Sequence, residues 1–89
     1  MSSLFPLGQT VITANARERL HPEDTLKCLA RHASGDWGEL CDEDRAENER
    51  SLRQSGRLFS VYHDRNGVKL YVITEADRSV TTTLLPEDY

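Results

Sequence analysis

The segment around His63 carries residue types that can cleave RNA without a metal ion. His63 is followed directly by Asp64 and Arg65. A histidine can move protons in general acid–base catalysis, and an arginine can stabilise the negative charge that develops on a phosphorane. One hypothesis is therefore a small metal-independent RNase or toxin-like domain. Its candidate catalytic residues are His63, Arg65, Arg57 and Tyr62. The structural alternative is an ordinary turn that follows a solvated strand face.

An acidic run between positions 36 and 49 is the second distinctive group. It holds seven carboxylates against one base, Arg45, and its net charge is therefore −6. The whole chain has a formal net charge of −4, which leaves the remaining residues at +2. Repulsion among these carboxylates lowers stability unless a basic partner offsets it, which suggests a binding surface. The structural alternative is a solvated helix face with acids near its N-terminus. The candidate partner-binding residues are Asp36, Trp37, Glu39, Asp42, Glu43, Asp44 and Glu47.

Trp37, the single tryptophan, lies between Gly35 and Gly38. Glycine lets the backbone approach its neighbours closely and turn sharply. A buried indole removes about 150 to 250 Å² from water. We therefore expect the ring to fold back and anchor a loop, and the alternative is an exposed ring that contacts a partner.

The remaining polar residues do not form a recognisable cofactor motif. His21, Cys28 and His32 lack the doubled spacing that is typical of zinc sites. Asp42, Glu43 and Asp44 are consecutive, without the alternating ligands and central glycine of a calcium loop. The sequence also lacks a phosphate-binding loop and a dinucleotide-binding fingerprint. We therefore expect neither a metal nor a cofactor, and the balance favours a protein without enzymatic activity.

The composition indicates one small domain spanning residues 1–89. Hydrophobic residues make up 37% and charged residues 29% of the chain, as in globular proteins. The first ten residues lack the basic and apolar regions of a signal peptide, and the apolar runs are too short to span a bilayer. We expect a cytoplasmic protein with no membrane contact, in which Cys28 and Cys41 are reduced.

The periodicity predicts an α+β domain. We expect a strand over residues 7–13, one helical turn over 15–20, a helix from Pro22 to about 33, and a second helix from Asp42 to Ser55 with Gly56 as its left-handed end. From residue 57 the period becomes two, and Asn66–Gly67 and Asp77–Arg78 mark turns between strands. The expected sheet is antiparallel, with three or four strands from the C-terminal meander and the N-terminal strand, and two helices packed on one face.

Four motifs support a resemblance at family level, namely "RHASGDWGEL", "ENERSL", "YHDRNG" and "ITEADRSVTTTLLPEDY". Together they resemble a family of small uncharacterised proteins carried on bacterial plasmids and integrative elements, over nearly the whole chain. The resemblance implies a mobile-element setting and evasion of host defence, in which a compact acidic domain would block the basic groove of a DNA-handling enzyme. The ending "VTTTLLPEDY" also resembles the terminal sheet of small RNase domains of the barnase, colicin and RelE type.

These observations give one leading expectation and two alternatives. The leading expectation is a non-enzymatic binding protein whose acidic helix engages a basic protein, such as a nuclease or a DNA-binding protein. Direct binding of nucleic acid is not expected, because phosphate-tracking surfaces are basic. The alternatives are the RNase described above and a structural subunit that forms a homodimer through an exposed sheet edge.

Overall fold

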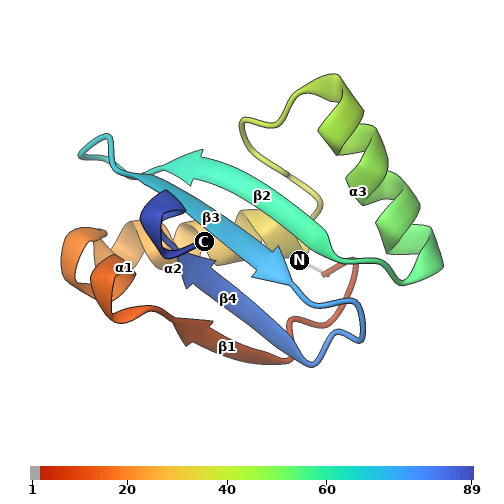
Figure 1. The fold of residues 1–89 in the computed structure, drawn as a ribbon, viewed down its shortest axis with the longest axis horizontal. Coiled ribbons are helices and arrows are strands. Elements are labelled where there is room, and N and C mark those ends of the chain that lie inside the picture. Colours follow the sequence, from red (N-terminus) through yellow and green to blue (C-terminus); the bar gives the residue numbers. More distant parts are fainter. Residues whose placement is uncertain (1–2) are drawn as a thin grey trace.

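The computed structural model describes residues 3–89 and has the expected α+β architecture (Figure 1). Four strands, three helices and a 3-10 turn follow one another along the chain. Their order is β1 (Gln9–Ile12), α1 (Ala14–Arg19), α2 (Pro22–Ala33), α3 (Asp42–Gln54), β2 (Leu58–His63), β3 (Lys69–Thr74), β4 (Val80–Leu84) and η1 (Pro86–Asp88).

The sheet is mixed, so the expectation of a wholly antiparallel sheet is wrong for its first strand. The strand order is β1-β4-β3-β2, and the meander from β2 to β4 is antiparallel as expected. β1 instead runs parallel to β4, with Gln9 opposite Val80 and Ile12 opposite Thr83. No hairpin connects these two strands, because most of the chain lies between them. Local turn signals therefore could not set their relative direction.

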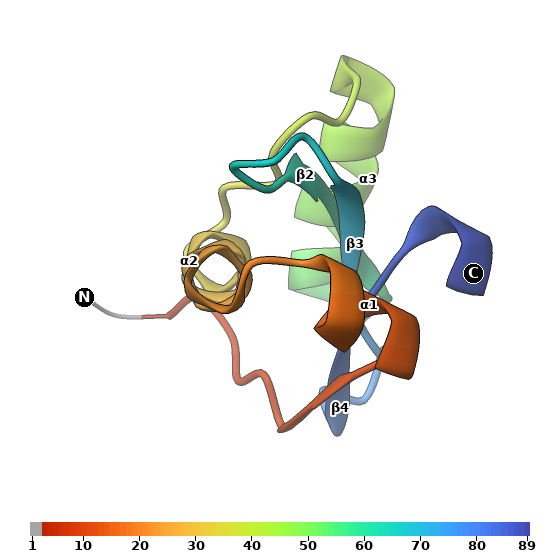
Figure 2. The ribbon, with the colours of Figure 1, turned by 90° about the vertical axis from the view of Figure 1, so that its left-hand side faces the viewer.

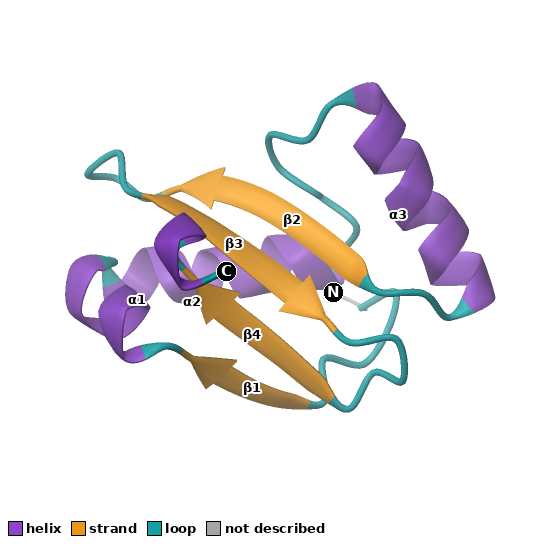
Figure 3. Cartoon of the chain, in the orientation of Figure 1, coloured by secondary structure: helices purple, strands orange, loops and turns teal. Residues whose placement is uncertain are grey.

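The helices occupy three different places. α2 covers one face of the sheet, whereas α3 lies beside the β2 edge and α1 follows the end of β1 (Figures 2 and 3). The expectation of two helices packed on one face is therefore only partly correct. α2 buries Cys28, His32 and Ala33 against the sheet. The buried residue of α3 is the polar Asn48. Ala46, an apolar residue of the same helix, is exposed. A helix without an apolar face has little to gain from lying across the sheet.

The turns between β2 and β3 and between β3 and β4 have the same hydrogen-bond pattern. The N–H of Gly67 donates to the carbonyl of Asp64, and the N–H of Arg78 donates to the carbonyl of Glu75, both at 2.9 Å. Gly67 has φ 80° and Arg78 has φ 62°, so a left-handed residue completes each hairpin turn. α3 ends at Gln54, and the left-handed residue after it is Ser55, with φ 58°, rather than the expected Gly56.

The core lies between the sheet and α2 and continues around the β2 edge. One cluster of buried residues includes Leu20, Cys28, Tyr62, Leu70 and Val72. A second cluster consists of Phe5, Trp37, Leu40, Leu58 and Val61. Residues of α2, of the 37–40 segment and of β2 thus share one packed interior, which positions the acidic run relative to the sheet.

A chain of buried polar groups crosses this interior. His32 is fully buried, with Nδ1 2.5 Å from the Ser60 hydroxyl and Nε2 2.9 Å from the Thr74 hydroxyl. Thr74 in turn lies 2.7 Å from Thr81, whose hydroxyl donates to the carbonyl of Leu7 at 2.7 Å. Burial, assisted by the positive charge of Arg78, lowers the pKa of His32 to about 4. The imidazole is therefore neutral at pH 7 and links α2 to the sheet as a structural group.

Candidate binding surface

The acidic run is attached to the outer edge of β2 through its backbone. The N–H of Val61 donates to the carbonyl of Trp37 at 3.2 Å, and the N–H of Glu39 donates to the carbonyl of Val61 at 2.8 Å. Gly38 lies between them with φ 76°, and a Cβ atom there would lie 2.0 Å from the Val61 carbonyl oxygen. Only glycine permits this approach, so Gly38 determines where the acidic segment meets the sheet.

Trp37 is enclosed by this arrangement. Its side chain is 2% exposed, and its ring lies 6.2 Å from that of Phe5 and 5.6 Å from that of His32. The indole Nε1–H donates to a carboxylate oxygen of Glu49 at 2.9 Å. Trp37, a candidate partner-binding residue, is therefore buried, and it anchors the loop to the core and to α3.

α3 is held to the sheet edge by polar side chains. Asn48 donates to the carbonyl of Phe59 at 2.6 Å and accepts from the N–H of Phe59 at 3.1 Å. Arg45 donates to the carbonyls of Leu40 at 3.1 Å and Gly38 at 2.5 Å. Arg45, the one base of the acidic run, thus bonds to backbone carbonyls and connects the helix to the loop that precedes it.

Four of the seven carboxylates in the run have partners within the protein. Asp36 pairs with Arg31 at 2.7 Å, and this guanidinium lowers the pKa of the Asp36 carboxyl. Glu39 lies 2.7 Å from Nδ1 of His63. Glu47 forms an ion pair with Arg50, and Glu49 accepts the hydrogen bond from the indole N–H of Trp37. Within residues 3–89, no ion pair involves Asp42, Glu43 or Asp44, which occupy the exposed first turn of α3.

A hollow of about 280 Å³ lies beside this part of α3. The acidic residues Asp44 and Glu47 line it, together with the aromatic residues Phe59 and Tyr89. The ring centroids of Phe59 and Tyr89 are 6.2 Å apart, and Tyr71 packs against both rings. Arg57 also lines the hollow, but its guanidinium lies 3.5 Å from Glu75. The complete lining is Leu40, Asp44, Glu47, Asn48, Arg57, Phe59 and Tyr89.

The candidate catalytic residues are only partly brought together. His63 and Arg65 line a second hollow of about 270 Å³, together with Lys27. Arg57 precedes β2 and His63 ends it, so these two lie at opposite ends of the strand. Tyr62 is 1% exposed, and its hydroxyl donates to the carbonyl of Asp36 at 2.5 Å. The proposed set of four therefore does not converge on one substrate position.

The charge of Arg65 is balanced within the protein. Its guanidinium lies 3.0 Å from Asp24 and 3.1 Å from Glu23. The hydrogen bonds from Arg65 lower the pKa of Asp24 to about 2, so the carboxylate is ionised at neutral pH. Cys28 lines the same hollow, but burial raises the pKa of its thiol to about 11, and a thiol in this state is a poor nucleophile.

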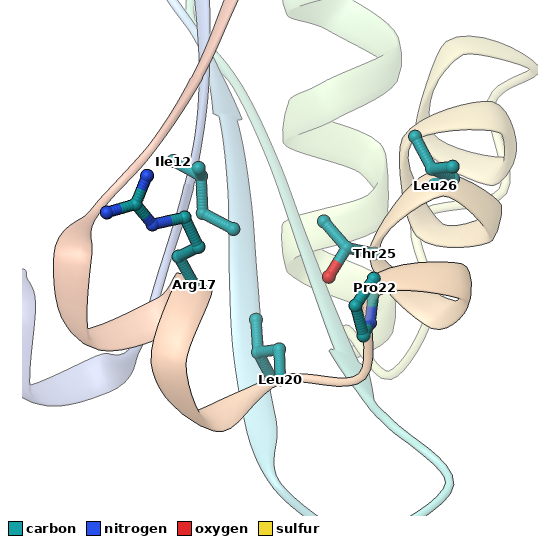
Figure 4. Close-up of a pocket in the computed structure, with 6 residues that line it drawn as sticks. All are labelled: Ile12, Arg17, Leu20, Pro22, Thr25 and Leu26. Carbon is teal, nitrogen blue, oxygen red and sulfur yellow. The ribbon is translucent and has the colours of Figure 1, made fainter.

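A third hollow, of about 250 Å³, lies between β1 and α2 (Figure 4). Within residues 3–89, its lining is Ile12, Arg17, Leu20, Pro22, Thr25 and Leu26, and Arg17 is its one charged residue. The sequence predicted none of these residues as a site, because they come from three separate elements. The aromatic residues Phe59 and Tyr89 of the acidic hollow were missed for the same reason, since 30 positions separate them.

Three further findings concern metal ligands, membrane spans and similar proteins. In the part of the chain that the structure describes, no group of three or more histidine, cysteine, aspartate or glutamate residues is arranged to hold a metal ion. None of the helices formed by residues 3–89 has the length and apolar character needed to cross a membrane. No protein-family model, curated protein or solved structure matches this chain.

Proposed function

We propose that this protein is a non-enzymatic binding protein that engages a basic protein surface through α3 and the hollow beside it. The observation that carries the proposal is the placement of Asp44 and Glu47 at a hollow that Phe59 and Tyr89 also line. Acids and aromatic rings at one place form a receptor for a cationic side chain, which an acidic helix in isolation does not.

Both the aliphatic stem and the cationic head of an arginine or lysine side chain suit this hollow. Its aliphatic stem can lie against Leu40, Phe59 and Tyr89, while its cationic head reaches the carboxylates. A cation over an aromatic ring adds about 0.5 to 1 kcal/mol at an exposed site. Because a guanidinium is planar and pairs with carboxylates in a bidentate manner, we expect arginine to bind more tightly than lysine.

The first turn of α3 extends the same surface. Asp42, Glu43 and Asp44 are exposed, and no ion pair within residues 3–89 reduces their charge. Charges of this kind attract a basic partner over about 8 Å at physiological salt. We therefore expect these carboxylates to increase the rate of association and the hollow to hold the bound side chain.

The partner is proposed to be a cytoplasmic nuclease or another DNA-handling protein that has a basic groove. We infer this class from the expected mobile-element setting, in which such a groove is a target for evading host defence. An acidic surface repels phosphates, so the proposal excludes direct binding of nucleic acid at α3.

The test compares two charge reversals in binding to a synthetic oligo-arginine peptide, measured by calorimetry at low and high salt. Asp44→Lys changes the hollow, and Glu18→Lys makes the same change on an exposed position of α1. We expect Asp44→Lys to weaken binding roughly tenfold or more, about 1.4 kcal/mol, and Glu18→Lys to have a much smaller effect. Equal affinities for the wild type and Asp44→Lys, with folding verified by circular dichroism, would overturn the proposal.

A capture experiment then identifies the partner. Tagged wild type and the triple variant Glu43→Lys, Asp44→Lys, Glu47→Lys are incubated with a bacterial lysate at low and high salt. A DNA-handling protein that is retained only by the wild type, and released by salt, supports the proposal. The competing result is RNA cleavage that disappears in His63→Ala, which would replace the proposed function with an RNase activity.

A further inference from the structure

The outer side of β1 is an open sheet edge. All four of its residues are exposed, including Val11 at 40% and Ile12 at 38%. The N–H of Gln9 donates to the carbonyl of Ser79, which precedes β4, at 2.9 Å, and the N–H of Thr13 donates to the carbonyl of Thr83 in β4 at 3.1 Å. Backbone direction alternates along a strand, so the N–H and C=O groups of Thr10 and Ile12 point away from β4. In Figure 1, β1 is the lowest strand, and no element of residues 3–89 is drawn beyond it.

An apolar groove accompanies this edge on the side of α2. Ile12 and Leu26 face the hollow of Figure 4 from β1 and α2. A neighbouring hollow of about 170 Å³ lies between Thr10, Leu26 and Leu29. Leu26 is 68% exposed although it lies on the helix that covers the sheet. Unpaired backbone groups and exposed apolar side chains therefore occur together at β1.

We propose that β1 pairs antiparallel with β1 of a second copy of this chain, about a twofold axis that passes beside Val11. In this register, Thr10 of each copy lies opposite Ile12 of the other. The outward N–H and C=O groups of both residues then form hydrogen bonds across the joint. The two Val11 residues meet as a non-hydrogen-bonded pair, and the two sheets become one continuous eight-stranded sheet.

The same register supplies an apolar occupant for the groove. Thr10 and Ile12 lie on the α2 side of β1, because their partners on β4, Thr81 and Thr83, are buried there. Ile12 of the second copy therefore lies beside Thr10, at the hollow that Leu26 and Leu29 also line. A copy of this chain thus satisfies both the backbone groups and the apolar surface.

Charge distribution favours a second copy as the occupant. No charged residue occurs between positions 7 and 16, and no proline occurs within β1, so the strand itself lacks the usual protections of an edge strand. Arg17 of α1 lines the hollow beside Ile12, and no carboxylate of the described residues lines it. The acidic run lies at the opposite edge of the sheet, beside β2. Joining two copies at β1 therefore places their acidic segments far apart. This leaves α3 free in each copy, so the inference does not depend on the proposed function.

Cross-linking tests the register directly. In a Cys41→Ser background, Val11→Cys places two thiols opposite each other, with Cα atoms about 4.5 to 5.5 Å apart, within the range of a disulfide. Diamide accepts the two electrons and two protons released when the bond forms. Gln9→Cys, on the same face, would place its two thiols about 14 Å apart along the strands and is the matched control. We expect a covalent dimer from Val11→Cys and much less from Gln9→Cys; equal cross-linking of both variants overturns the register.

Sedimentation equilibrium tests association without a cross-link. We expect the mass of the wild type to rise from 10.1 kDa toward twice that value between micromolar and millimolar concentration. Val11→Lys places like charges together at the axis and should remain monomeric. The control Leu4→Lys adds the same charge at an exposed apolar residue outside β1 and should behave as the wild type. If Val11→Lys fails to fold, Thr10→Pro removes an outward N–H instead. A wild type that stays monomeric at millimolar concentration, or a Val11→Lys variant that dimerises equally, overturns the proposal.

Discussion

The two edges of the sheet are treated in opposite ways. At the β2 edge, the backbone groups of Phe59 and Val61 bond to Asn48 and to the 37–39 segment. At the β1 edge, the corresponding groups of Thr10 and Ile12 point away from the sheet with no described element beside them. One edge is closed by the protein itself, and the other is available for pairing.

The comparison shows how edge closure and charge are coupled in this protein. The segment that closes β2 also carries the acidic run, which would repel a second chain of the same charge. β1 itself carries no charged residue. Strong negative charge is therefore placed where strand pairing is already complete, and a strand without charged residues lies where it is not. The predictions below change the closed edge or the groups that attach it to the rest of the sheet.

The largest effect is expected for Trp37→Ala, which removes the anchor of the closing segment. The indole is buried among Phe5, His32 and Leu58, and truncation of such a ring costs about 3 to 5 kcal/mol of unfolding free energy. Urea denaturation measures the loss. Trp37→Phe keeps an aromatic ring but loses the bond to Glu49 and part of the buried volume, so its cost should be smaller than that of the alanine variant. A cost below about 1 kcal/mol for the alanine variant would show that the edge stays closed without its anchor.

The next largest effect is a loss of stability in acid. It arises at His32, in the chain of buried polar groups that runs from Ser60 to Leu7. The pKa of His32 is about 4 in the folded protein, against 6.5 for a free imidazole. Between these values the unfolded state binds more protons, so this contribution is present above pH 6.5 and is lost as the pH falls to 4. The difference corresponds to roughly 3 kcal/mol.

Urea denaturation as a function of pH tests this assignment. His32→Asn should be less stable at pH 7 and should lack most of the decline between pH 6.5 and 4. His21→Asn changes a histidine that caps α2 and should preserve the decline, because asparagine is also a good N-cap. An unchanged decline in His32→Asn would assign the acid sensitivity to other groups.

A smaller effect is expected for Asn48→Leu, which opens the closed edge. The substitution leaves the N–H and C=O of Phe59 without their partner and should cost about 2 kcal/mol. Thermal unfolding measures the cost, and light scattering measures any new edge-to-edge aggregation. Gln54→Leu replaces another side-chain amide by leucine at an exposed position of α3 and should stay within about 0.5 kcal/mol of the wild type. Equal stability of both variants would contradict the role of Asn48.

The smallest effect is expected for Glu47→Gln, which breaks the exposed pair with Arg50. Both side chains are more than half exposed, and such pairs contribute about 0 to 1 kcal/mol. Thermal unfolding should therefore hardly change, whereas binding to oligo-arginine should weaken if the carboxylate belongs to the proposed receptor. A large loss of stability would instead make Glu47 a structural residue.

The sequence alone determined the local parts of this fold. The antiparallel meander follows from period-two patterning and from turns that end in Gly67 and Arg78. The start of α2 follows from Pro22 with two acids behind it, and the start of α3 follows from Asp42. These features depend on neighbours within a few residues, where propensity and hydrogen bonding act strongly. The acids that line the proposed receptor, Asp44 and Glu47, could be identified in the same way.

Tertiary structure decided the remainder, because the contacts involved join distant segments. The direction of β1 depends on its fit beside β4, and the position of α3 depends on a polar residue, Asn48, that reaches a backbone 11 positions away. Periodicity could not show that four of the seven acids find internal partners. It also could not show that Phe59 and Tyr89 meet beside α3. Whether a charge is balanced or free is a property of three-dimensional neighbours, and the sequence lists only neighbours along the chain.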